Sequence, residues 1–354
     1  MAHAQPAAAA AGAPAFIVDT DCGVDDAQAL FVLLSRHQRG LLRVAAITCT
    51  HGNTSLHNVV QNVCAVLDVF GLGAAGIPVF RGCDRALLAA STNDGAAFHG
   101  ADGLGNSGLG APAGPARQAV HPTEHASAAL LRLAREAAAA GAPLTLLTLG
   151  PLTNVALALR LGSAGGGPQL SACLARLVVM GGAHRAEGNT PVAPAAEFNV
   201  MEDPEAASMV FGTDWGAATV DLVTWELTKS SGLAPAALAA WLHPQPATPR
   251  AAWLAAASAH LVQKTAAFAP EAYARSGFYI PDPLAACVAV APELVVAQAA
   301  TVGVLVELAG KWGRGATLVD WRGEHAAAAP RCVRLVSAVH GAAVQALLVE
   351  SVRE

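Results

Sequence analysis

The residues whose types and spacing most clearly indicate chemistry are four aspartates that directly follow one short apolar run. Phe16–Val18 leads into Asp19, Asp21, Asp25 and Asp26. Because side chains alternate along a strand, Asp19 and Asp21 lie on one side of the strand end, and the other two aspartates begin a helix. Carboxylates this close raise one another's pKa unless a cation lies among them. The cluster therefore predicts a metal site, and ligands that are all oxygen favour calcium or magnesium over zinc.

A purely structural interpretation accounts for only part of this cluster. Asp25 can cap a helix and Asp26 can favour its dipole, as acidic residues at a helix N-terminus often do. Asp19 and Asp21 would then stand beside an apolar strand without a partner, at a cost in free energy. We therefore favour the metal site.

Three polar residues elsewhere indicate a functional site only when they are considered together with this cluster. Asp282 stands in a Pro-Asp-Pro turn just before an apolar helix expected over Leu284–Val290, where a solitary aspartate is more often a cap than a ligand. Asn53 follows a predicted strand, and His99 lies between glycines in a long loop. Surface histidines usually have no function, so His99 alone would decide nothing.

A further group of candidates follows Met180. Two glycines after this residue let the backbone approach a ligand. Beyond them, Asn189, Glu197 and Asn199 offer the hydrogen-bond donors and acceptors that a polyhydroxyl sugar requires.

These side chains must be positioned by alternating strands and helices. Short β-branched or Leu-rich runs alternate with Ala-rich helical stretches, the first over Asp25–Arg36, as in a parallel sheet with crossover helices. Six strands are expected, over Phe16–Val18, Val44–Ile47, Pro78–Phe80, Leu144–Leu149, Leu177–Met180 and Ala218–Leu222. Their carboxyl ends form the edge where open α/β sheets bind ligands.

Later in the chain we expect a long Ala-rich helix over Pro249–Ala274 and two further strands over Val302–Leu308 and Thr317–Asp320. No repeat or linker marks a domain boundary. Met1–Pro14 is almost all Ala, Gly and Pro, without the basic start or Leu-rich stretch of a secretory signal. We therefore expect a disordered tail over residues 1–14 and one large α/β domain over 15–354.

The composition excludes several classes of partner. Only 13% of the 354 residues are charged and 5% are aromatic, with a formal net charge of -5, so the chain has no basic stripe or aromatic platform for nucleic acid. It also lacks the roughly 18 consecutive apolar residues of a membrane span. The seven cysteines are scattered and never spaced as CxxC, which argues against a disulfide framework or a zinc knuckle. We expect a cytoplasmic protein with a small-molecule ligand.

Taken together, these motifs resemble the inosine-uridine-preferring nucleoside hydrolase family. The family's signature Asp-Thr-Asp-x-Gly-x-Asp-Asp is matched at Asp19–Asp26. Further matches follow in the same order at Thr50–Asn53, Phe98–Gly100, Leu149–Asn154, Val179–Gly182, Glu197–Asn199, Asp282–Leu284 and Val319–Gly323. The resemblance implies a Rossmann-like α/β fold with a mainly parallel sheet flanked by helices, and hydrolysis of the N-glycosidic bond of ribonucleosides to ribose and free base.

The resemblance also implies roles for particular residues. Calcium would be held by Asp21, Asp26, Asp282 and the backbone carbonyl of Leu149, and Asp21 would act as general base towards a calcium-bound water. The residues expected to bind the substrate are Asp25, Asn53, Met180, Asn189, Glu197, Phe198, Asn199 and Asp282. An anionic Glu197 near the 5' hydroxyl should repel a 5'-phosphate and so favour nucleosides over nucleotides. By the same resemblance we expect a homodimer or homotetramer.

One position departs from the family pattern. Many members carry a histidine immediately before the last metal-binding aspartate, as the acid that protonates the leaving base, but this chain has Pro281. His99, Tyr279 or Trp225 could serve instead by proton donation or stacking, and we favour His99.

Two other functions stay open at this point. A haloacid-dehalogenase-like phosphatase also uses Asp-x-Asp after its first strand, with magnesium, but it needs Thr or Val where this chain has Gly23. A protein that only binds nucleosides or ribose would explain Pro281 as a sign of a decayed site. The chain retains five aspartates, Asp19, Asp21, Asp25, Asp26 and Asp282. This argues against decay, because unpaired acids would destabilise a protein that no longer used them.

Overall fold

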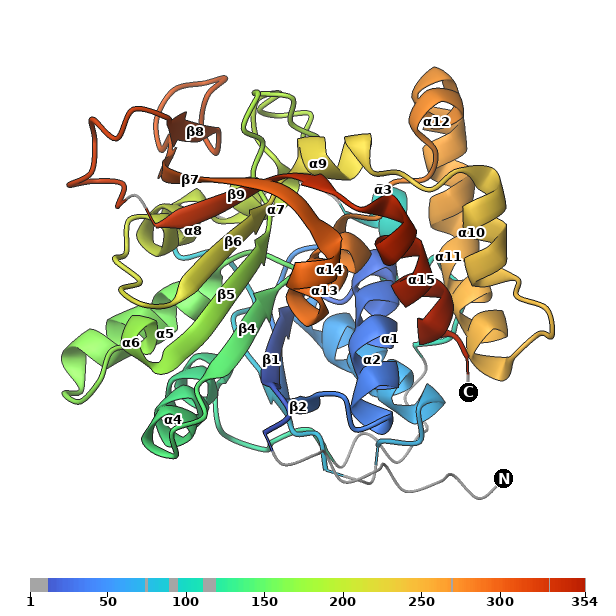
Figure 1. Cartoon of the computed structure of the whole chain (residues 1–354), viewed down its shortest axis with the longest axis horizontal. Helices are drawn as coiled ribbons and strands as arrows, with labels where there is room; N and C mark the ends of the chain where they lie inside the picture. Colours follow the sequence, from blue (N-terminus) through green and yellow to red (C-terminus); the bar gives the residue numbers. More distant parts are fainter. Residues whose placement is uncertain are drawn as a thin grey trace.

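The computed structural model describes residues 12–73, 76–88, 95–110, 119–268, 270–330 and 332–353. Within them, nine strands form one sheet in the order β3-β2-β1-β4-β5-β6-β9-β7-β8 (Figure 1). The strands are β1 Ala15–Thr20, β2 Arg43–Cys49, β3 Val79–Arg81, β4 Leu144–Thr148, β5 Leu174–Met180, β6 Thr219–Val223, β7 Val296–Val306, β8 Thr317–Asp320 and β9 Val333–Val339. Neighbouring strands from β3 to β9 are parallel, whereas β7 runs antiparallel to both β9 and β8.

Helices cover both faces of the sheet (Figure 1). One face carries α1 Val24–Gln38, α2 Leu56–Val69, α10 Pro235–Leu242, α11 Pro249–Phe268, α13 Pro281–Val290 and α15 Gly341–Ser351. The other carries α4 Ala126–Ala139, α5 Thr153–Ala164, α6 Leu170–Cys173 and α8 Pro204–Phe211. The remaining short helices are α3 Ala96–His99, α7 Phe198–Glu202, α9 Trp225–Ser230, α12 Pro270–Ser276 and α14 Pro292–Val295.

The first strand shows why the run Phe16–Val18 is apolar throughout. Phe16 and Val18 belong to one hydrophobic cluster and Ile17 to the other, on the opposite face. A strand buried on both faces reads as a continuous hydrophobic run, unlike a strand with one wet face. This confirms the expected α/β fold with a mainly parallel sheet flanked by helices.

All six predicted parallel strands are present, but the later elements differ from the prediction. The helix expected over Pro249–Ala274 corresponds to α11 and α12, which lie on either side of residue 269, outside the described residues. Strand β7 begins at Val296, six residues before the predicted start at Val302, and β9 was not predicted.

The order of the strands fixes where a ligand can bind. β2 and β3 lie on one side of β1, and β4, β5 and β6 lie on the other. At this switch point the crossover connections leave in opposite directions, which opens a crevice at the carboxyl ends of the central strands. β1 ends at Thr20 and β4 at Thr148, so Asp21 and Leu149 stand directly beyond the two strand ends.

Two further expectations concern the ends of the chain and membranes. Residues 1–11 of the proposed tail lie outside the described residues, as does Glu354. Among the helices of the described ranges, none is both long and apolar enough to cross a membrane.

Candidate active site

Acidic side chains from two distant parts of the chain meet at this edge of the sheet. Asp25, Asp26 and Asp282 each place a carboxylate oxygen within 4.8 Å of the others. The first two lie in the first turn of α1, and Asp282 lies in the first turn of α13, which packs against α1. The helix expected to start at Leu284 in fact begins at Pro281, so the Pro-Asp-Pro sequence is its first turn.

Asp21 faces the same group. It is fully buried, and burial together with the charge of Asp26, and more weakly that of Asp25, raises its pKa well above the usual value. Its Oδ2 accepts a hydrogen bond of 2.8 Å from the backbone N–H of Asn53. Its Oδ1 is buried without a hydrogen-bond partner. One carboxylate oxygen is therefore held in place and the other is left open for chemistry.

Two glycines allow this close packing around Asp21. A Cβ added at Gly52 would lie 2.0 Å from Oδ2 of Asp21, and one at Gly150 would lie 2.7 Å from its Oδ1. Gly52 also has a φ of 151°, which side-chain-bearing residues rarely adopt. Backbone without a side chain therefore packs against the Asp21 carboxylate on two sides.

This contact predicts the effect of Gly52→Ala. The added methyl group must displace Asp21, and a misplacement of about 1 Å can cost about 100-fold in rate. We expect kcat to fall by about that factor while the variant remains folded. Gly341→Ala is the matched control, because a Cβ there meets no atom within 4 Å. A Gly52→Ala enzyme with the parental kcat would show that the position of Asp21 is not critical.

Asp26 is held by three donors. Thr20 Oγ1 donates to its Oδ1 at 2.5 Å, while the backbone N–H of Gly23 and Nδ2 of Asn53 each donate to its Oδ2 at 2.9 Å. Gly23 is the N-cap of α1. The interpretation of these acids as helix caps is therefore partly right, but Asp26 and not Asp25 accepts the hydrogen bond from the N-cap. Asn53, predicted as a sugar ligand, binds two of the acids, Asp21 and Asp26.

The donor set fits a hard divalent cation. Burial is the first cause of the raised pKa values of Asp25, to about 6, and of Asp282, to well above the usual range. Without a counter-charge, burial therefore opposes the ionisation of both acids. Oδ1 of Asp25, like Oδ1 of Asp21, is buried without a hydrogen-bond partner, so the group has oxygen lone pairs to offer. Carboxylate oxygens are the ligands that calcium and magnesium prefer.

The carbonyl of Leu149 reaches the same region but already has one partner. Nδ2 of Asn199 donates to it at 2.8 Å and also to the carbonyl of Met180 at 3.2 Å. Because a carbonyl oxygen has two lone pairs, this hydrogen bond leaves one acceptor position on Leu149. The contact also brings the predicted substrate residue Asn199 beside the predicted metal ligand.

Asp19 takes no place among the clustered acids. Its Oδ1 accepts hydrogen bonds from Thr48 Oγ1 at 2.5 Å and from Nδ2 of Asn154 at 2.8 Å. Burial raises its pKa to about 7. Asn154 also binds the carbonyl of Cys49 at 3.0 Å, so it ties β1, β2 and α5 together. Asn154 belongs to the motif Leu149–Asn154, but the sequence pattern indicated no role for it.

Glu197 is the N-cap of α7, beyond the two glycines that follow Met180. Its Oε2 accepts from the backbone N–H of Gly182 at 2.9 Å, and its Oε1 accepts from that of Asn199 at 3.0 Å. Asn189 is close by, because its Oδ1 accepts a 2.7 Å hydrogen bond from the N–H of Phe198. Burial raises the pKa of Glu197 to about 7, so its negative charge is complete only above that pH.

The residues proposed for the leaving base lie at two positions around the acids. His99 Nδ1 accepts a 3.2 Å hydrogen bond from the N–H of Val24 and lies 3.6 Å from Oδ1 of Asp25. Burial lowers the pKa of His99 to about 4, so the imidazole is neutral at pH 7 with its proton on Nε2. Trp225 and Tyr279 form an edge-to-face pair with ring centroids 5.6 Å apart. Tyr279 lies three residues before Asp282 in the sequence.

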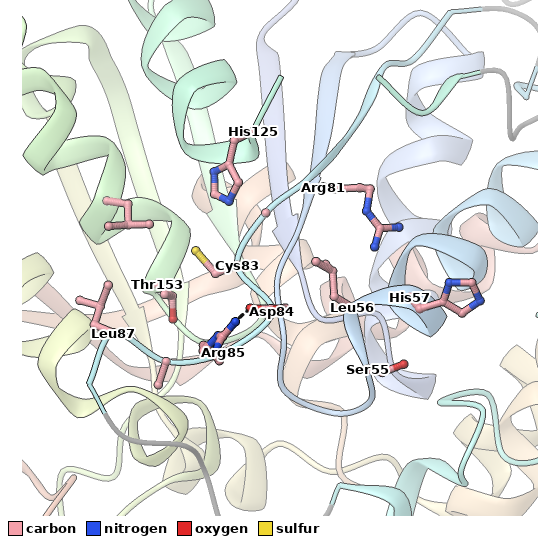
Figure 2. Close-up of a pocket in the computed structure, with 13 residues that line it drawn as sticks. Ser55, Leu56, His57, Arg81, Cys83, Asp84, Arg85, Leu87, His125 and Thr153 are labelled. Carbon is pink, nitrogen blue, oxygen red and sulfur yellow. Dashed lines mark hydrogen bonds and ion pairs between the residues drawn. The ribbon is translucent and has the colours of Figure 1, made fainter. Parts of the chain in front are cut away.

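A hollow in the described residues lies beside the acids and not over them. Its volume is 740 Å³, and Figure 2 shows exposed basic side chains such as Arg81 and Arg85 around it. None of the residues predicted from the sequence lines it. Oγ1 of Thr153 in its wall is 3.1 Å from Nε2 of His51, the neighbour of Gly52. We therefore place the chemistry at the acids.

A doubly wound α/β sheet with buried carboxylates at its switch point defines a class of protein whose clustered acids could hold a metal ion. The comparisons agree with this class and narrow it. The sequence pattern of the inosine-uridine preferring nucleoside hydrolases matches residues 16–346. The chain belongs to this family.

Individual relatives support the assignment. The chain is 35% identical to the inosine-uridine preferring nucleoside hydrolase of Leishmania major. The match covers 62% of this chain and 63% of the relative, so it spans less than two thirds of the relative's length. It is 29% identical to the enzyme of the same name from Crithidia fasciculata over 86% of its length and 87% of that protein. The solved structure of an inosine-guanosine nucleoside hydrolase superposes with a TM-score of 0.80 at 30% identity, covering 96% of this chain and 98% of the other.

Proposed function

We propose that this protein hydrolyses the N-glycosidic bond of ribonucleosides, releasing ribose and a free base, with calcium as its metal. The observation that carries the proposal is the open, buried Oδ1 of Asp21 beside three further clustered acids. The names of the relatives in the preceding section, all nucleoside hydrolases, support the substrate class. A phosphatase is not favoured, because nothing in the comparisons points to that class.

The proposed metal ligands are the carboxylates of Asp21, Asp26 and Asp282 and the carbonyl of Leu149, with Asp25 close enough to contribute. A divalent cation bound there would raise the acidity of water and help to orient the sugar hydroxyls. Asp21 accepts the proton of the attacking water at Oδ1, the oxygen that has no other partner. Asn53 holds the other oxygen of Asp21, so the base has a fixed orientation.

The same acids favour bond breaking at the sugar. As the glycosidic bond lengthens, positive charge develops on the ribosyl group, and carboxylates already oriented around it stabilise that charge. Asp25 and Asn53 lie beside the metal ligands, where the sugar hydroxyls would meet them. Their positions are fixed by α1 and by the turn after β2, so little reorganisation accompanies the reaction.

The far end of the sugar is assigned to Glu197, Asn189 and Asn199, with Met180 and Phe198 beside them. Three backbone N–H groups hold the carboxylate of Glu197 in place. A 5' hydroxyl can donate to this carboxylate, whereas a 5'-phosphate would be repelled by it. Because the pKa of Glu197 is about 7, we assign this discrimination mainly to neutral and alkaline pH.

The function is tested by following free ribose from inosine and from uridine. The purified protein, first stripped with a chelator, is assayed without metal and with added calcium, magnesium or zinc. We expect ribose release that depends on metal and is highest with calcium. Phosphate release from sugar phosphates serves as the competing assay. Nucleoside binding without any ribose release would identify a binding protein and refute the proposed reaction.

The position before Asp282 predicts a strong dependence on the leaving group. Pro281 has no proton to donate, and neutral His99 is a weak acid at pH 7. General acids commonly contribute about 100-fold or more to rate. We therefore expect p-nitrophenyl riboside, whose leaving group needs no acid, to react at least about 100-fold faster than inosine. Equal kcat values would show that another donor acts on the base, and His99→Ala would then test that residue.

The raised pKa values predict how metal binding depends on pH. In the folded, metal-free chain burial raises the pKa of Asp25 to about 6 and also raises those of Asp21, Asp26 and Asp282, whereas the unfolded values lie near 4. Groups with a raised folded pKa stabilise the fold below about pH 4 and lose this contribution as the pH rises through the folded pKa, which is about 6 for Asp25. A cation must displace the retained protons, so its affinity rises over the same window.

We therefore expect calcium to raise the melting temperature much more at about pH 8 than at about pH 5, whereas the chelated protein becomes less stable over that change. At about 100 times Kd, calcium adds about 2.7 kcal/mol to the free energy of unfolding. Thermal unfolding with chelator and with calcium measures both trends, and calorimetry in two buffers measures the protons released. A calcium effect that does not change with pH would contradict the proposed carboxylate site.

A further inference from the structure

Three buried polar side chains that the proposed reaction does not use are joined by hydrogen bonds. Oγ1 of Thr153 donates to Oδ2 of Asp203 at 2.7 Å, and it lies 3.1 Å from Nε2 of His51. All three side chains are buried, and we call them the polar network. A buried donor or acceptor that loses its partner costs free energy, so each member of the network restrains its neighbours.

The direction of each hydrogen bond follows from the protons available. The hydroxyl of Thr153 has one proton, which it gives to the carboxylate of Asp203, so it can only accept from His51. Burial lowers the pKa of His51, so the ring is neutral at pH 7 and carries its proton on Nε2. The other ring nitrogen, Nδ1, lies 4.0 Å from Oε2 of Glu202, which is longer than a hydrogen bond. The hydroxyl of Thr153 therefore orients the ring.

His51 begins the turn that holds two of the clustered acids. Asn53, two residues later, donates its backbone N–H to Oδ2 of Asp21 at 2.8 Å and its Nδ2 to Oδ2 of Asp26 at 2.9 Å. Between the two residues, Gly52 packs so closely against Asp21 that a Cβ would lie 2.0 Å from the carboxylate. A shift of the His51 ring would therefore carry the donors of both acids with it.

Asp203 fixes the other end of the network where two helices meet. It follows α7 directly and is the N-cap of α8, and its Oδ1 accepts from the N–H of Ala206 at 3.0 Å. Its Oδ2 also accepts from the N–H of Leu87 at 2.9 Å. α7 carries Asn199, whose Nδ2 donates to the carbonyl of Leu149. The network thus connects the helix beside one proposed metal ligand to the turn that holds two others.

We infer that His51, Thr153 and Asp203 are positioning residues, which hold the turn of Asn53 and through it the carboxylate of Asp21. They act through Asn53 and not on the substrate. The effect on rate rests on the proposed function, whereas the effect on the turn does not depend on any reaction. Loss of a side chain that supports a ligand or a base commonly costs about 10- to 100-fold in affinity or activity.

Thr153→Val tests the network, because valine keeps the shape of the side chain and removes the hydroxyl. At saturating calcium we expect kcat for inosine or uridine to fall by about 10- to 100-fold, with KM within about threefold of the parent. Thr153→Ser restores a hydroxyl and should recover kcat to within about threefold. Thr213→Val is the matched control, because its Oγ1 also donates at 2.7 Å, to the carbonyl of Met209 at the far end of α8.

Hydrogen–deuterium exchange of the chelated protein measures the turn itself. The backbone N–H groups of Thr50, His51 and Asn53 are all hydrogen-bonded, so they exchange slowly while the turn is held. We expect Thr153→Val to speed their exchange by about 10-fold, as the loss of one buried hydrogen bond would, and to leave β5 and β6 unchanged. A side chain with only a packing role would speed exchange throughout and lower the melting temperature, without a selective effect on kcat.

The two measurements separate this inference from the proposed function. A parent that releases no ribose refutes the function, and parental exchange in the turn of Thr153→Val overturns the inference by itself. In an active parent, an unchanged kcat in Thr153→Val would also overturn it. So would a loss that Thr153→Ser does not recover, or an equal loss in Thr213→Val. His51→Leu breaks the network from its other end and carries the same expectations if Thr153→Val does not fold.

Discussion

Asp21→Asn is expected to lower kcat by about 1,000-fold or more at saturating calcium. The amide keeps the shape of the side chain, and its oxygen can still accept the 2.8 Å hydrogen bond from the N–H of Asn53. It cannot take a proton from water, because an amide is not a base at this pH. The effect should fall on kcat and leave KM nearly unchanged, because proton transfer stabilises the transition state and not the bound substrate.

The control for this variant is Asp84→Asn. Asp84 is an exposed aspartate whose partner Arg85 is also exposed, so its loss should change neither kcat nor KM. Calcium affinity is measured for each variant, because a weaker metal site alone would lower the rate at low calcium and recover at high calcium. An Asp21→Asn enzyme that regains near-parental kcat when saturated with calcium would remove Asp21 as the general base.

Asp282→Asn is expected to weaken calcium binding by about 100-fold or more, since changes even beyond the direct ligands cost 10- to 100-fold. Asp282 is 2% exposed, and burial together with the charges of Asp25 and Asp26 raises its pKa well above the usual range. Without metal, ionisation of Asp282 at about pH 8 therefore destabilises the fold. Its removal should raise the melting temperature in chelator at about pH 8.

The variant should change the melting temperature in opposite directions in chelator and in calcium, which makes this prediction specific. Thermal unfolding should show Asp282→Asn more stable than the parent in chelator and less stable than the parent in calcium. A residue with only a packing role would lower the melting temperature under both conditions. Calorimetric titration with calcium gives the affinity directly. Unchanged affinity in the folded variant would exclude Asp282 from the metal site.

The fold and part of the site follow from local sequence patterns. The run Phe16–Val18 followed by four aspartates is local, so both the strand and the acidic cluster could be predicted from it. The meeting of Asp282 with Asp26 is a tertiary contact between α13 and α1. The pattern around Asp282 indicates only a turn, and the resemblance to a family was needed to connect the two.

Other features could not be predicted because they depend on the assembled fold. Asp19 looked equivalent to Asp21 by spacing, but Thr48 and Asn154 hold it within the sheet, and only strand neighbours reveal that. The exposure of Leu318 and Trp321 at β8 was also not predicted. The strand Thr317–Asp320 was expected, but its place at the end of the sheet order determines that its apolar neighbours are exposed.

The distance in sequence between Asp21 and Asp282 has a consequence for synthesis. When the first strand and α1 have left the ribosome, α13 has not yet been made, so the nascent chain has neither the complete ligand set nor the helix that buries it. The early acids remain hydrated and uncrowded until that late segment docks against α1. The electrostatic strain of the finished cluster therefore arises only at the end of folding, and a bound cation would relieve it.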